Sequence, residues 1–187
     1  MVRFWLLPLA VLALACAPQY PGDPVGTFDV TGALVANSCG HEAVPALDPV
    51  EFPVELRARQ TQAYWRRGGA RLVSGYMDHD GVYHFLNSTR IPAPAVQTED
   101  GPGCTLVREE TLEIRVLAAS EDGGEPEDAA NMASTAPPSA LAGQHTIDIR
   151  PDRDSACSPL LVTQGGPFDA LPCRIEYELV GAARAPF

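Results

Sequence analysis

Apolar and polar side chains alternate along most of the chain beyond residue 26, which is the pattern of half-buried β-strands. The clearest case is the segment 173–179, where Cys173, Ile175, Tyr177 and Leu179 share one face and charged residues occupy the other. The same period of two recurs in other segments that we expect to be strands, among them residues 27–37, 54–59, 70–77, 82–87, 104–118 and 146–150. About eight or nine strands at this spacing, without a convincing long helix, predict an all-β domain.

Glycine-containing turns join neighbouring strands. Both Gly68-Gly69 and Asp78-His79-Asp80-Gly81 lie between two alternating segments, as the turns of β-hairpins do. Strands joined in this way form an antiparallel meander, and closure of the meander removes its exposed edges. We therefore predict a single domain over residues 26–187, built as a small closed or partly open β-barrel. A β-sandwich is the alternative architecture.

The predicted strand 104–118 interrupts its own alternation. Leu112, Ile114 and Val116 share a face, and the same face continued toward the N-terminus would hold Glu110 and Arg108. We favour a β-bulge near residues 108–110, which would shift the register and turn both charges outward. The alternative is an ion pair inside a cavity.

Residues 119–144 form a longer interruption of the alternating pattern than residues 108–110. This segment lacks aromatic and β-branched apolar residues and contains five acidic residues with no basic one. Such a composition is typical of a flexible loop. We predict an acidic flexible insert at about residues 119–144.

The first sixteen residues differ in pattern from the rest. Arg3 precedes an apolar run at residues 4–14, and the small residue Ala15 then precedes Cys16. The run is shorter than the roughly 20 residues that a membrane-spanning helix needs. Its order of charge, apolar core and small residue is that of a cleaved export signal. We predict a signal peptide at residues 1–15 and a proline-rich tether at residues 16–25.

The last four of these residues, Ala13-Leu14-Ala15-Cys16, resemble the lipobox of bacterial lipoproteins. The resemblance implies that Cys16 is lipidated and anchors the mature chain to the cell envelope, and Ala17 after it favours the outer membrane. An ordinary A-x-A cleavage site before a chance cysteine is the alternative. The composition, in which all thirteen basic residues are arginine, is similar to that of uncharacterised small lipoproteins of high-GC soil bacteria. That likeness implies no activity.

Assignment of Cys16 to lipid leaves an even number of cysteines. Cys39, Cys104, Cys157 and Cys173 suit two disulfides in an oxidising compartment. In an up-and-down barrel all four would lie at one end. We favour the pairs Cys157–Cys173 and Cys39–Cys104, and the crossed pairs Cys39–Cys173 and Cys104–Cys157 fit the same end.

A basic and aromatic run stands out because the chain as a whole has a formal net charge of -11. Such acidity argues against nucleic acid as a partner. Forked guanidinium groups beside aromatic rings could bind an anionic glycan, a phosphate headgroup or an acidic envelope protein. The alternative is that these arginines pair with neighbouring acids. The members of this candidate anion-binding patch are Arg57, Arg59, Tyr64, Trp65, Arg66, Arg67 and Arg71.

Motifs for catalysis are missing from the sequence, which contains no G-x-S-x-G or H-E-x-x-H segment. His79 and His84 near Asp78 and Asp80 are interpreted as turn residues rather than metal ligands. We assign no catalytic residue, metal or cofactor.

Three functions remain open. The one we favour is a membrane-anchored, non-enzymatic envelope lipoprotein with a binding or structural role. The second is a lipocalin-like carrier of a small apolar ligand, although Gly26-Thr27-Phe28 stands where lipocalins have G-x-W. The third is a hydrolase whose site has no recognisable motif.

Overall fold

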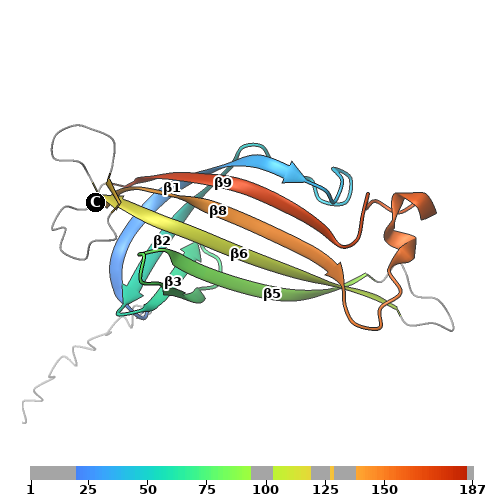
Figure 1. Cartoon of the computed structure of the whole chain (residues 1–187), viewed down its shortest axis with the longest axis horizontal. Helices are drawn as coiled ribbons and strands as arrows, with labels where there is room; N and C mark the ends of the chain where they lie inside the picture. The colour runs from blue at the N-terminus through green and yellow to red at the C-terminus, as the bar shows by residue number, and fades with distance from the viewer. Residues whose placement is uncertain (1–19, 94–102, 119–126, 129–137, 185–187) are drawn as a thin grey trace, which may run out of the picture.

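The computed structural model describes residues 20–93, 103–118, 127–128 and 138–184 (Figure 1). The predicted signal peptide, Cys16 and most of the predicted acidic insert lie outside these residues. Across the described part of the chain, no helix is long and apolar enough to cross a membrane.

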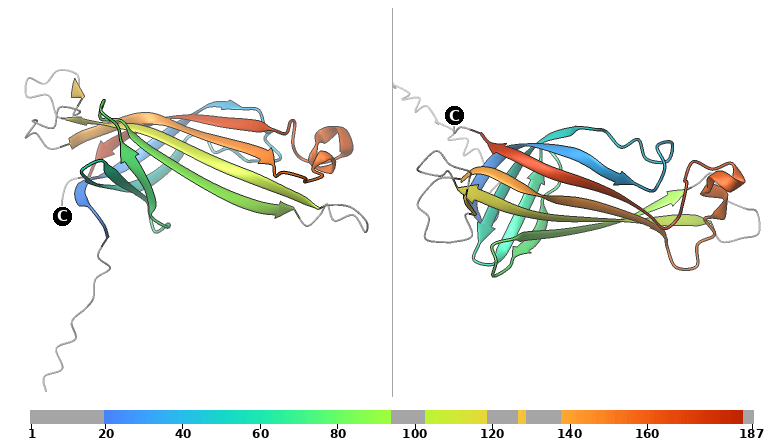
Figure 2. Two further views of the ribbon diagram at one scale, coloured as in Figure 1. Left: turned by 60° about the horizontal axis from the view of Figure 1, so that its bottom comes forward. Right: turned by 45° about the horizontal axis from the view of Figure 1, so that its top comes forward.

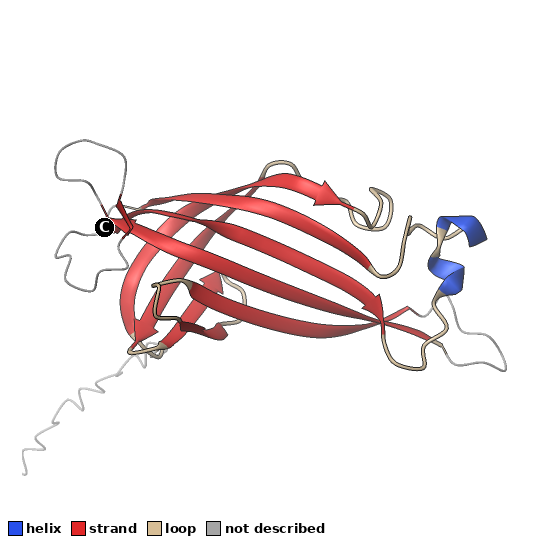
Figure 3. Cartoon of the chain, viewed as in Figure 1, coloured by secondary structure: helices blue, strands red, loops and turns tan. Residues whose placement is uncertain are grey.

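The described residues form an all-β fold, as predicted (Figure 3). Two short 3-10 turns, η2 (Ser158–Leu160) and η3 (Val162–Gln164), interrupt the loop before the last strand. A two-residue strand, β7 (Glu127–Asp128), pairs with the end of β6. The remaining strands are β1 (Asp23–Asn37), β2 (Val50–Arg59), β3 (Gln62–Arg67), β4 (Val73–Met77), β5 (Tyr83–Ala93), β6 (Cys104–Ala118), β8 (Pro138–Pro151) and β9 (Cys173–Ala183).

The strands close into a barrel. Their order in the sheet is β5-β4-β3-β2-β1-β9-β8-β6-β7, and an additional pairing between β5 and β6 joins the two sides. Every pairing between the described strands is antiparallel, so that eight strands form one up-and-down meander (Figures 1 and 2). The predicted barrel is therefore confirmed, and the sandwich alternative is wrong.

The four cysteines form two disulfides, and our favoured pairing of them is wrong. The bonds join Cys39 to Cys173 and Cys104 to Cys157, which is the crossed alternative. Two disulfides are consistent with an exported protein.

Strand register explains the pairing. Cys39 follows β1 and Cys173 begins β9, and the backbone bond from Ser38 N to Arg174 O (2.9 Å) continues the β1–β9 ladder between them. At the same end of the barrel, Asp152 N donates to Thr105 O (2.8 Å). This bond holds the loop that contains Cys157 beside the start of β6. Adjacent strands thus bring together the cysteines that sequence spacing could not match.

Several strand boundaries differ from the predictions; β5, for example, continues to Ala93 rather than ending at residue 87. β8 begins at Pro138, so residues 138–144 belong to the barrel and the insert ends earlier than expected. β1 begins at Asp23, inside the predicted tether. A turn at Gln60 and Thr61 separates β2 from β3, with Gln60 at a φ of 57°.

The predicted β-bulge in β6 is also wrong. β6 pairs with β5 from Cys104 to Ile114 without a register shift, and its pairing with β8 shifts only between Leu117 and Ala118. Uninterrupted alternation places Arg108 and Glu110 on the same inner face as Leu112 and Ile114. These charges point into the barrel because the barrel is not filled there.

A filled core occupies the rest of the interior. Burial of each large apolar side chain there stabilises the fold by about 1.5–3 kcal/mol. The large aliphatic and aromatic residues with almost no exposed surface are Phe28, Val30, Val54, Leu56, Ile114, Leu141, Ile175 and Leu179.

Candidate functional site

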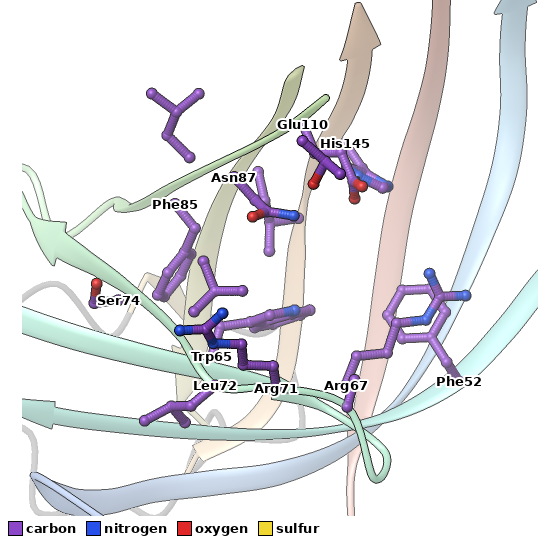
Figure 4. Close-up of a pocket in the computed structure, with 15 residues that line it drawn as sticks. Phe52, Trp65, Arg67, Arg71, Leu72, Ser74, Phe85, Asn87, Glu110 and His145 are labelled. Carbon is purple, nitrogen blue, oxygen red and sulfur yellow. The ribbon is translucent and has the colours of Figure 1, made fainter. Parts of the chain in front are cut away.

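A cavity of about 560 Å³ lies inside the barrel where the core ends. Its volume is in the range of pockets that hold small ligands, about 300–1,000 Å³. None of the fully buried core residues lines it, so the interior is divided into a filled part and an open part. The lining residues are Phe52, Trp65, Arg67, Ala70, Arg71, Leu72, Val73, Ser74, Phe85, Leu86, Asn87, Thr89, Glu110, Leu112 and His145 (Figure 4).

Aromatic rings form part of the cavity wall. Alternation along β3 and β5 turns Trp65 and Phe85 inward, where their ring centroids are 5.8 Å apart. Phe52 from β2 and Leu112 from β6 are buried beside them. These four side chains come from strands β2, β3, β5 and β6 of the meander, and the curvature of the barrel turns them toward one interior space.

Glu110 lies at the centre of a polar cluster in the cavity. Its carboxylate lies 3.2 Å from Nη2 of Arg108 and 3.4 Å from Nε2 of His145, which comes from β8. The His145 ring stacks on Tyr177, with centroids 6.2 Å apart. The hydrogen bond with His145 is the main cause that lowers the pKa of Glu110, against the opposite effect of burial. Glu110 is therefore a carboxylate at neutral pH.

Arg67, at the end of β3, lines the same cavity and is also exposed to solvent. Its guanidinium lies over the Phe52 ring, 3.8 Å from the centroid (Figure 4). Burial is the main cause that lowers the pKa of Arg67; Glu110 acts in the opposite direction and Arg108 in the same one. Burial also raises the pKa of Tyr177, which the charges of Arg67 and Arg108 partly offset. These side chains therefore form one electrostatic cluster.

The predicted arginine patch does not lie on one face. Alternation along β3 turns Trp65 and Arg67 into the barrel and leaves Tyr64 and Arg66 on the outer surface. Arg71 lines the cavity from the loop between β3 and β4.

The outward arginines bind neighbouring groups, as the alternative interpretation of the patch expected. Arg66 pairs with Glu55, donates to the Tyr20 hydroxyl (2.7 Å) and lies over the Tyr20 ring. Arg57 pairs with the same glutamate (3.1 Å) and donates to the carbonyl oxygen of Gly22. Residues 20–22 of the predicted tether are thus held against the barrel. Arg59, at the end of β2, is exposed.

Sequence reasoning missed most of the cavity. Phe52, Asn87, Glu110 and His145 come from four different strands, and no motif in the sequence connects them. The one available signal was the broken alternation at residues 108–110.

Asp78 caps its turn and Gly81 has a positive φ of 74°, as the turn interpretation of this segment predicts. Asp78 Oδ1 accepts hydrogen bonds from the backbone amides of Asp80 and Val82, and Oδ2 lies 2.8 Å from Nε2 of His84. Among the residues that the structure describes, no three His, Cys, Asp or Glu side chains are grouped as metal ligands would be.

Comparison of the chain with protein-family models, with curated proteins and with solved structures finds no match. The functional argument therefore rests on the residues themselves. They define a closed up-and-down β-barrel with a filled core and an internal cavity that combines aromatic walls with charged groups.

Proposed function

We propose that the protein is a lipid-anchored envelope protein that carries a small, partly apolar ligand in its barrel cavity. The observation that supports this proposal is the cavity of about 560 Å³ lined by Phe52, Trp65, Phe85 and Leu112. Apolar walls with a few inward polar groups are the usual composition of a small-molecule site. A purely structural role would not require this opening in the core.

The carrier interpretation is preferred to the other two functions from the sequence. A scaffold that binds through its outer arginines is less favoured, because Arg57 and Arg66 already pair with Glu55 and contact residues 20–22. A hydrolase would use His145 as a general base and the Glu110 carboxylate to orient the His145 ring. Within the described residues, no hydroxyl or thiol hydrogen-bonds to His145, so this pair supports the hydrolase less well than the cavity supports a carrier.

Lipidation of Cys16 would hold the barrel close to its membrane. Only residues 17–19 separate Cys16 from Tyr20, which Arg66 holds against β3. Four residue steps span at most about 14 Å. A lipid on Cys16 would therefore place the carrier at the membrane surface rather than on a long tether.

Replacement of Cys16 by serine tests the anchor. We expect Cys16→Ser to move nearly all of the protein from the membrane fraction to the soluble fraction, because the acyl chains supply the membrane affinity. Fractionation and immunoblotting of cell envelopes measure the change, with Ala17→Ser as the neighbouring control that stays in the membrane. Retention of Cys16→Ser in the membrane after residues 1–15 have been removed would show that the anchor is not this lipid.

Occupation of the cavity by a side chain tests the carrier function. The neutral fluorescent probe N-phenyl-1-naphthylamine should bind the full chain with Cys16→Ser, which needs no detergent. Asn87→Trp, whose side chain would enter the cavity from β5, should weaken probe binding at least roughly tenfold, or about 1.4 kcal/mol. Fluorescence titration measures the dissociation constant.

Ser88→Trp is the matched control. Ser88 is the next residue of β5, so alternation turns its side chain away from the cavity, which it does not line, and this variant should bind the probe like the parent protein. The carrier proposal fails if the parent does not bind the probe, or if the two tryptophan variants bind it equally well.

A further inference from the structure

Charge is unevenly distributed in the cavity. The charged residues of its lining are Arg67, Arg71 and Glu110, an excess of positive charge in a chain whose formal net charge is -11. The only carboxylate in the lining is already paired, since Glu110 binds Arg108 and His145. The cavity therefore offers positive charge that the protein itself does not neutralise.

Arg67 is the guanidinium in position to bind a ligand. No carboxylate or hydrogen-bond acceptor among the described residues pairs with it, and its guanidinium lies on the face of the Phe52 ring. A ring beneath the guanidinium plane leaves the N–H groups at its edge free to donate. Because Arg67 belongs to strand β3, its backbone is held more firmly than that of Arg71, which lies in the β3–β4 loop.

The surroundings of Arg67 favour an anion. Arg67 and Arg108 repel each other in a space where protein has displaced part of the water, and Glu110 offsets only part of that repulsion. An added carboxylate would accept two parallel hydrogen bonds from one guanidinium, which is a strong and geometrically specific contact. A cationic ligand would be repelled by the positive charges of Arg67 and Arg108.

We infer that the cavity takes a carboxylic acid with an apolar body, whose carboxylate pairs with Arg67 while its apolar part packs on Trp65, Phe85 and Leu112. This inference rests on the proposed carrier function and adds the chemical class of the ligand. Asn87 and Thr89 line the same cavity and provide neutral hydrogen-bonding groups.

Displacement of the fluorescent probe tests the inference with three ligands of equal chain length. Dodecanoate, dodecan-1-ol and dodecylammonium compete for the full chain with Cys16→Ser, each below its micelle-forming concentration. We expect dodecanoate to displace the probe at concentrations roughly tenfold lower than the alcohol, because a charge-assisted hydrogen bond is worth about 1.5–3 kcal/mol. Dodecylammonium should be the weakest of the three.

Arg67→Gln identifies the residue that binds the carboxylate. In this variant the preference for dodecanoate over dodecan-1-ol should fall to within about threefold, with the affinity for the alcohol unchanged. Arg59→Gln removes the same charge from the outer face of β2 and should keep the full preference. The unchanged alcohol affinity also shows that the variant is folded.

The outcomes separate this inference from the proposal beneath it. If the alcohol competes as well as the acid, or if Arg67→Gln keeps the preference for the acid, the inference is overturned and the carrier function stands. If the probe binds but none of the three ligands displaces it, the inference is overturned and the carrier function stands; if the probe itself does not bind, both are overturned.

Discussion

Removal of the Cys39–Cys173 disulfide, by replacement of both cysteines with alanine, is expected to lower the free energy of unfolding by about 5 kcal/mol. The bond joins residues 134 positions apart, so its loss releases most of the chain in the unfolded state. Both cysteines are buried at the end of the β1–β9 ladder, and the folded barrel keeps that ladder beside them. Chemical denaturation followed by circular dichroism of the full chain with Cys16→Ser measures the loss.

The second disulfide is the internal control for this prediction. Cys104–Cys157 spans 53 positions, and the same chain-entropy argument gives a loss of about 4 kcal/mol for its double alanine variant. We therefore expect the Cys39–Cys173 variant to be the less stable of the two. The reverse order would mean that native packing, rather than loop length, decides the effect. A peptide map that joins Cys157 to Cys173 would contradict the pairing itself.

Strand alternation is the part of this fold that the sequence specifies best. The segment 104–118 was predicted with the bounds that β6 has, and the segment 173–179 lies within β9. Both are long strands with one apolar face, so a period of two is visible over many residues. Closure followed from the physical requirement that a meander of such strands cover its edges.

The cavity could not be predicted in the same way, because it breaks the rule used to find the strands. Inward side chains were expected to be apolar, and Arg108 and Glu110 were therefore assigned to a bulge. Their strand continues without one, since an unfilled interior allows charged groups to pair there. The partner His145 lies on β8, and only the register between β6 and β8 brings the two together.

Two other features of the fold also differ from what local sequence patterns predict. The basic run that contains Arg66 and Arg67 is continuous in sequence, yet alternation sends these two neighbours to opposite faces of β3. The turn after β2 contains no glycine or asparagine that would predict it from the sequence. Gln60 adopts the left-handed conformation there instead. In each case the sheet imposed an arrangement that composition alone does not indicate.

The largest effect of a single substitution is expected from Phe28→Ala, in the filled part of the barrel. Phe28 has no exposed surface, and its ring covers Gly26, where an added Cβ would lie 2.8 Å from the ring. Loss of the ring removes buried apolar contacts and leaves a cavity in a closed core that cannot collapse freely. We expect a loss of about 3–5 kcal/mol in the free energy of unfolding.

Val35→Ala is the control for this substitution, because Val35 lies in the same strand with 63% of its surface exposed. That variant should change stability by no more than about 0.5 kcal/mol. Phe28 does not line the ligand cavity, so Phe28→Ala should bind N-phenyl-1-naphthylamine like the parent protein under conditions where it is folded. Weaker binding, comparable with that of Asn87→Trp, would show that the filled and open parts of the barrel are coupled. Equal binding would show that the core supports the barrel while the cavity alone holds the ligand.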